Sequence, residues 1–193
     1  MKATKTIFLI ALSFLLGGYS LYAQNGRFDI VLGGGYYSTP ARKPVLGGGV
    51  FNAEFEYHHK KRWSFAAGIL TTQYHYRMEE SSSSTLGGIP INRASELQSN
   101  FLVKYKILEK GAFTFQLGAG AGLITMGENT EIRTPTSSSN YFTSYTDLGF
   151  PIVAETYARI TDHFLVGVKL GTFIFPDYPI IGNNASLQVR YRL

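Results

Sequence analysis

Histidine is the residue of this chain best suited to acid–base chemistry, since the sequence contains four histidines and no cysteine. Two histidines open the basic run His58–Arg62, and His163 directly follows Thr-Asp; both stretches are typical of solvated turns rather than metal sites. His75 is the candidate for nucleophilic catalysis, because Ser81–Ser84 follow it closely. No fixed spacing links the two, so we predict no catalytic and no metal-binding residue.

Charged residues recur on one side of several alternating segments. Long acidic and basic side chains that share a narrow protein interior must pair, because an isolated buried charge is very costly. The group offers no nucleophile and no cofactor motif, so it indicates a structural charge network rather than an active site. The predicted network comprises Glu54, Glu56, Lys104, Glu155, Arg159, Lys169 and Arg190, with Arg159 near enough to the rim to reach water.

The stretch Leu97–Leu123 shows which elements position these charges. It is interrupted only by the polar break Glu109–Gly111, and each arm alternates apolar and polar residues with a period of two. One face of each arm carries mostly apolar side chains in a row, and the other face is largely polar, with three glycines in the second arm. This pattern predicts a β-hairpin whose apolar face meets lipid and whose polar face lines a cramped interior.

Eight segments of this kind follow one another, and their apolar faces carry no Asp, Glu, Lys or Arg. Tight turns centre near Lys60, Lys110 and Asp162, and they alternate with longer polar stretches. Two of these stretches, Arg77–Arg93 and Gly127–Ser144, are predicted to be long loops at the extracellular end. The predicted fold is therefore all-β: an eight-stranded antiparallel up-and-down transmembrane β-barrel.

The first residues are typical of a secretory signal peptide. Lys2 and Lys5 precede the apolar run Ile7–Leu16, and small residues lead to a cleavage site that we place after Ala23. The predicted domains are a signal peptide at 1–23 and one outer-membrane β-barrel domain at 24–193. The net charge of +5 falls to +3 without the two leader lysines, which is too weak and too scattered to indicate nucleic-acid binding.

The whole predicted mature chain resembles the small eight-stranded outer-membrane barrels, such as the OmpA/OmpX-like family. Tyr22-Ala23-Gln24 and the ending Gln188–Leu193 look like the outer membrane protein β-barrel domains of Bacteroidota. The resemblance implies the outer membrane of a Gram-negative bacterium as the location. It also implies contact with lipid and lipopolysaccharide, and with the outer-membrane assembly machinery through the last strand. Because fold does not determine function, the resemblance does not imply any particular activity.

A structural or surface-binding role through the extracellular loops is the leading hypothesis, with a lumen closed by charge pairs. We expect a monomer that is not an enzyme, has no cofactor and does not bind nucleic acid. Two alternatives stay open. One is a lipid-modifying barrel enzyme of the deacylase or acyltransferase type that uses His75, and the other is a narrow channel.

Overall fold

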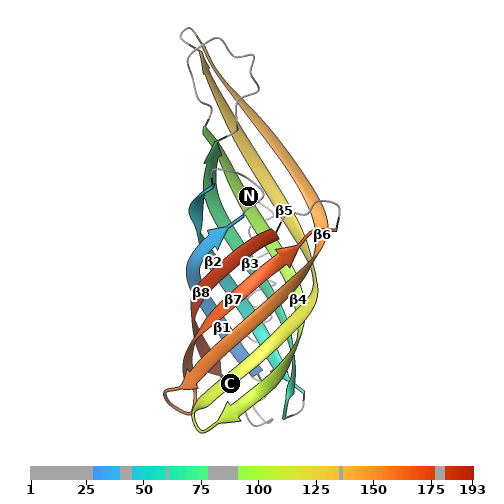
Figure 1. Ribbon diagram of the computed structural model, residues 1–193, viewed down its shortest axis with the longest axis vertical. Coiled ribbons are helices and arrows are strands. Elements are labelled where there is room, and N and C mark those ends of the chain that lie inside the picture. Colours follow the sequence, from blue (N-terminus) through green and yellow to red (C-terminus); the bar gives the residue numbers. More distant parts are fainter. Residues whose placement is uncertain (1–27, 40–44, 60, 78–90, 135–136, 177–180) are drawn as a thin grey trace, which may run out of the picture.

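The predicted fold class is confirmed: eight antiparallel strands form one closed barrel in which β1 pairs with β8 (Figure 1). The structure is a computed structural model that describes residues 28–39, 45–59, 61–77, 91–134, 137–176 and 181–193. Its strands are β1 (Phe28–Ser38), β2 (Val45–His58), β3 (Trp63–Arg77), β4 (Ile91–Lys110), β5 (Phe113–Thr134), β6 (Ser137–Arg159), β7 (Phe164–Ile174) and β8 (Ile181–Arg192). The predicted signal peptide, residues 1–23, lies outside the described residues.

The outward faces of the strands are apolar, as the alternation of the sequence predicts. Large hydrophobic side chains are exposed along every strand, whereas the residues between them point into the barrel and are mostly buried. Examples of the exposed set are Leu32, Phe55, Ile69, Phe101, Leu117, Ile152, Val168 and Leu187. A water-exposed surface of this kind would be unfavourable, so the outward face is suited to lipid.

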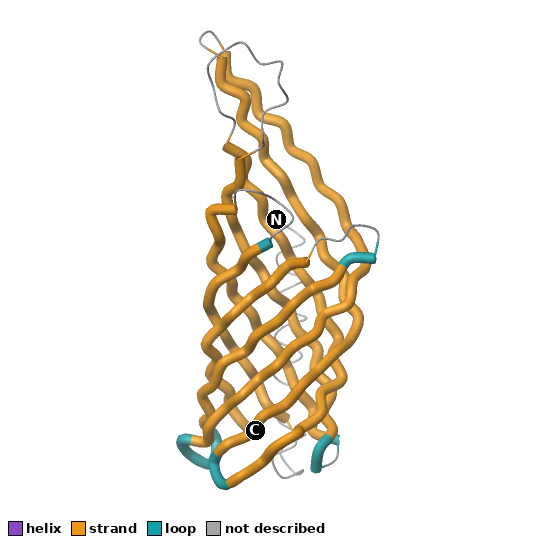
Figure 2. The backbone as a smooth tube through the Cα atoms, viewed as in Figure 1, coloured by secondary structure: helices purple, strands orange, loops and turns teal. Residues whose placement is uncertain are grey.

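Aromatic pairs surround one end of the barrel, which we call the turn end because it holds the three short connections between strands (Figure 2). Trp63 of β3 stands opposite Tyr105 of β4 with ring centroids 4.8 Å apart, and Phe164 of β7 stands opposite Tyr191 of β8 at 5.1 Å. Such a girdle is typical of the water–lipid boundary of a membrane barrel.

The opposite end, which we call the loop end, is uneven in height (Figure 1). β4, β5 and β6 have 20, 22 and 23 residues, whereas β1, β7 and β8 have 11, 11 and 12. Beyond the last β6–β7 pair, Phe150 with Ile174, β6 pairs with β5 alone among the residues that the structure describes. We call this part, 125–134 of β5 and 137–149 of β6, the outer hairpin.

The outer hairpin corrects one expectation. Gly127–Ser144 was expected to be a polar loop, but the ladder of β5 and β6 continues through it to Thr134 and Ser137. The second predicted loop, Arg77–Arg93, is also shorter than expected, because β3 extends to Arg77 and β4 begins at Ile91. Among the described residues, no helix has the length and apolar character that a membrane span requires.

Candidate functional site: the luminal ion cluster and the loop end

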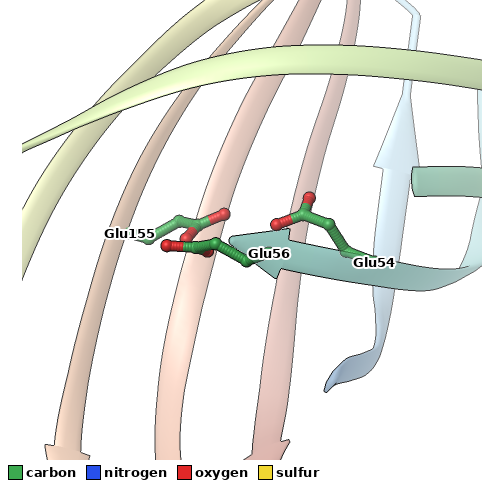
Figure 3. A group of neighbouring side chains, drawn as sticks. All are labelled: Glu54, Glu56 and Glu155. Atoms are coloured by element: carbon green, nitrogen blue, oxygen red, sulfur yellow. The ribbon is translucent and has the colours of Figure 1, made fainter. Parts of the chain in front are cut away.

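Three carboxylates converge inside the barrel near the turn end. Glu54 and Glu56 are alternate residues of β2, so both point inward, and Glu155 faces them from β6 (Figure 3). Their carboxylate oxygens lie within 4.8 Å of one another, and all three residues are buried. Three like charges this close in a low-dielectric interior repel strongly, so cations must lie among them.

Lys104 of β4 supplies the central cation. Its Nζ is paired with Glu54, lies 3.0 Å from Glu56 Oε2 and 2.9 Å from Glu155 Oε1, and its side chain is fully buried. The three carboxylates could ligate a metal ion by their spacing alone. Because the ammonium group already contacts all three, it holds the position that a bound cation would take.

Two further cations enter from the next strands. Lys169 of β7 lies 2.6 Å from Glu54 Oε2 and 3.2 Å from Glu155 Oε1. Arg190 of β8 places Nη1 2.8 Å from Glu56 Oε2 and Nη2 3.0 Å from Glu155 Oε2. The guanidinium carbon of Arg190 also lies 4.4 Å from the centre of the Tyr157 ring, which adds a cation–π contact.

Asp29 of β1 is a fourth carboxylate that the sequence prediction did not include. It accepts hydrogen bonds from Arg192 Nε at 3.0 Å and Arg190 Nη1 at 3.3 Å, and its side chain is fully buried. His58 Nε2 lies 2.9 Å from Asp29 Oδ2. The interpretation of His58 as a solvated turn residue is therefore wrong, because β2 extends to His58 and only 11% of its side chain is exposed.

We call these four acids and four bases the ion cluster. Its members are Asp29, Glu54, Glu56, Lys104, Glu155, Lys169, Arg190 and Arg192. Opposite charges are equal in number, and neutral donors complete the shell: Ser64 Oγ donates to Glu56 at 2.7 Å and Gln116 Nε2 to Glu155 at 2.7 Å. Six of the seven predicted network residues are thus brought together, and Arg159 lies apart with an exposed side chain.

The ion cluster and the side chains above it fill the lumen. A cavity of about 20 Å³ remains between Glu54 and Lys169 on one side and Phe173 on the other, which is room for about one water molecule. Towards the loop end, buried apolar side chains pack across the interior, among them Ile124, Met126 and Phe173. In the described part of the chain, the interior is therefore packed rather than open.

A second buried carboxylate lies nearer the loop end. Glu96 of β4 accepts hydrogen bonds of 2.6 Å from the hydroxyl groups of both Tyr37 and Tyr74, and Gln98 Nε2 lies 3.5 Å away. These contacts join β1, β3 and β4 inside the barrel. Sequence reasoning missed this group, although Glu96 has the same inward parity as Gln98 and Lys104.

His75 lies on the outward face of β3, as its parity predicts, and it is exposed. Arg93 stands directly opposite on β4, and its Nε donates a 3.2 Å hydrogen bond to His75 Nε2. Within the described residues, His75 makes no other side-chain hydrogen bond. The serines Ser81–Ser84 lie outside the described residues. His163 is exposed in the β6–β7 turn, where Nδ1 lies 3.0 Å from the Arg192 carbonyl oxygen.

The outer hairpin exposes aromatic side chains on both of its faces. Tyr141 is 60% exposed, and Phe142, on the opposite face of β6, is 73% exposed. Tyr145 extends along the inner face and donates from its hydroxyl to Met126 Sδ at 2.7 Å. Exposed aromatic residues that protrude on a pair of strands are typical of a protein-binding surface.

Comparison with solved structures identifies the fold as that of small outer-membrane β-barrels. Neisserial surface protein A is 12% identical with a TM-score of 0.56, and the match covers 86% of this chain and 97% of that chain. The attachment invasion locus protein Ail of Yersinia pestis is 13% identical with a TM-score of 0.53, over 88% and 100%. OprG of Pseudomonas aeruginosa is 9% identical with a TM-score of 0.58, over 87% and 98%.

Identities this low establish the fold alone. No protein-family model matches the chain, and no curated protein matches it significantly. Membership in the OmpA/OmpX-like or Bacteroidota families therefore stays a prediction.

Proposed function

We propose that this chain is an outer-membrane barrel of a Gram-negative bacterium with a structural and surface-binding role. It is exported by the signal peptide at 1–23, recognised by the assembly machinery through β8, and inserted as a monomer. The exposed apolar rows and the aromatic girdle at the turn end support the membrane assignment. In this orientation the turn end faces the periplasm and the outer hairpin faces the outside of the cell.

The outer hairpin carries the proposed binding role. It rises beyond the shorter strands, and the edge of β6 before Phe150 is not paired with β7. An unpaired strand edge offers backbone donors and acceptors to a strand of another protein, and Tyr141 and Phe142 add exposed apolar area beside it. The partner class is therefore a protein that presents an extended segment.

The packed lumen supports a closed barrel over a channel. Lys104, Lys169 and Arg190 cross the interior to carboxylates on other strands, and the remaining cavity is about 20 Å³. A passage would require the separation of buried ion pairs, which is costly. The enzyme alternative has less support, because His75 is bonded to an arginine rather than to an orienting carboxylate.

Placement in the membrane is tested by fractionation and by an epitope inserted between Thr134 and Ser137. We expect the protein in outer-membrane fractions with a heat-dependent shift in gel mobility, and the epitope to be accessible to antibody on intact cells. A protein found in the soluble fraction, or an epitope detected only after permeabilisation, would contradict the assignment.

Binding is tested by adherence of expressing cells to surfaces coated with serum and matrix proteins. The double variant Tyr141→Ser/Phe142→Ser should reduce adherence to that of cells without the protein, at unchanged surface amount. The matched control is Phe113→Ser, an exposed aromatic change at the turn end, which should retain adherence once its surface amount is matched. Equal adherence of wild type and the double variant would contradict a binding role for the hairpin.

A further inference from the structure

His75 and Arg93 form a cross-strand pair on the outward face of the barrel, just beyond its apolar rows. The two residues are direct neighbours in the β3–β4 register, and both are exposed. Directly below them on the same two columns lie Gln73 and Ser95, then Thr71 and Leu97, and then Ile69 and Ser99. A short polar stretch therefore separates the pair from the apolar rows, and the pair stands above it.

The position along β3 places this pair at a defined height. His75 is twelve residues beyond Trp63, which marks the aromatic girdle at the turn end. A strand advances about 3.3 Å per residue, and a tilt of about 40° reduces twelve residues to about 30 Å along the barrel axis. The apolar band of such barrels is about 25 Å tall, so the pair lies a few ångströms above it, at the level of lipid headgroups.

The hydrogen bond between the two side chains fixes which donors remain. Arginine Nε–H can only donate, so His75 Nε2 accepts and the ring hydrogen is on Nδ1. Toward the described part of the chain, the Nη groups of Arg93 and the Nδ1–H of His75 remain as donors. Among the residues that the structure describes, no carboxylate lies within salt-bridge distance of Arg93.

Two arginines at the turn end, by contrast, are bonded to protein partners. Arg192 is paired with Asp29, and Arg62 donates to the Tyr105 hydroxyl at 3.1 Å. Arg93 is bonded to a neutral ring nitrogen, which orients the guanidinium without neutralising it. A fixed guanidinium with free Nη donors is suited to phosphate, which it can bind through two parallel hydrogen bonds.

We propose that His75 and Arg93 bind a phosphate group on the headgroup of a lipid in the outer leaflet. The proposal rests on the proposed membrane orientation, which places the loop end on the cell exterior. The acyl chains of the same lipid would lie against the outward apolar side chains below, such as Leu97 and Ile69. The lipid would therefore be held by phosphate contacts at one level and apolar contacts beneath them.

The test titrates the folded barrel, in neutral detergent, with lipid A that carries its phosphates and with the same lipid A after enzymatic dephosphorylation. We expect the wild type to bind the phosphorylated form about tenfold more tightly, as one charge-assisted contact warrants. Arg93→Gln should remove this preference, and His75→Ala should reduce it severalfold. Arg62→Gln, an exposed arginine change at the turn end, should keep the wild-type preference.

Inorganic phosphate is the third titrant, because it offers the same chemistry without the lipid. Competition only at concentrations far above those of lipid A supports a headgroup site, whereas equally tight binding of inorganic phosphate would overturn the lipid assignment. If Arg93→Gln kept the full wild-type preference for phosphorylated lipid A, the assignment of the site to Arg93 would be wrong. Folding of each variant is checked by the heat-dependent gel shift, and the accessibility of the epitope between Thr134 and Ser137 separately tests the membrane orientation.

Discussion

Neutralising Glu155 tests whether the ion cluster holds the barrel together. The substitution Glu155→Gln keeps the size of the side chain and removes one charge from a fully buried position. Lys104, Lys169 and Arg190 then lose a carboxylate at 2.9, 3.2 and 3.0 Å. Two opposite charges 4 Å apart attract by about 4 kcal/mol at an effective dielectric constant near 20, so several such attractions offset the desolvation of each ion.

The expected loss is about 3 to 5 kcal/mol of unfolding free energy, the range for removing one partner of a buried ion pair. Equilibrium urea unfolding in phospholipid vesicles measures it through the fluorescence of Trp63, the single tryptophan of the chain. Arg159→Gln is the matched control, because the Arg159 side chain is exposed and lies outside the cluster; it should change stability by less than about 0.5 kcal/mol.

A double variant separates charge imbalance from loss of packing. Lys104→Met removes the central cation, and combined with Glu155→Gln it restores equal numbers of acids and bases. We expect the double variant to be more stable than the sum of the two single effects by at least about 1 kcal/mol. If Glu155→Gln unfolds within about 0.5 kcal/mol of wild type, or if the two effects add, electrostatic coupling in the cluster is refuted.

Four other outcomes follow from the same structure. Val168→Arg, in the middle of the outward face of β7, should cost about 2 to 4 kcal/mol in lipid, whereas Phe142→Arg above the apolar band should cost less than about 1 kcal/mol by urea unfolding. Replacing 128–143 by a two-residue turn should leave folding intact by the gel-shift assay, because Asn129 and residues 140–143 of this segment are exposed. Planar-bilayer recordings of the wild type should show no steady, large single-channel conductance. Asp29→Asn removes the charge that is paired with Arg192 and with Nη1 of Arg190. This substitution should slow refolding into vesicles more than Arg159→Gln does.

The fold was predictable because lipid imposes a strict alternation on each strand. Phe51, Phe55 and Ile69 point outward where the period of two places them, and Glu54 and Lys104 point inward. The outer hairpin was not predicted, because it lies beyond the part of the barrel where lipid imposes this alternation. Residues 140–146 of β6 are exposed on both faces, so polar residues occur on both and no apolar alternation marks this part of the strand.

The ion cluster was only partly predictable, because the residue pattern of a single segment does not determine its register with a distant strand. Parity alone shows that Glu54, Glu56 and Lys104 face the interior. It does not show that Asp29 lies beside Arg192, or that His58 is the last residue of β2 rather than part of the turn. An inward acidic residue on β1 was a usable signal, since the predicted bases outnumbered the predicted acids.

The ion cluster also explains how one end of the barrel can be fixed while the other varies. Its members come from β1, β2, β4, β6, β7 and β8, so ion pairs join six of the eight strands at the turn end. Arg190 and Arg192 meet Asp29 across the seam between the last strand and the first, which is the pairing of greatest sequence separation and the costliest to close. Because these contacts close the ring at the turn end, the strands above them can differ in length without opening the barrel. The outer hairpin and the His75–Arg93 pair occupy that freer half, where substitutions cost little stability and can be selected for binding.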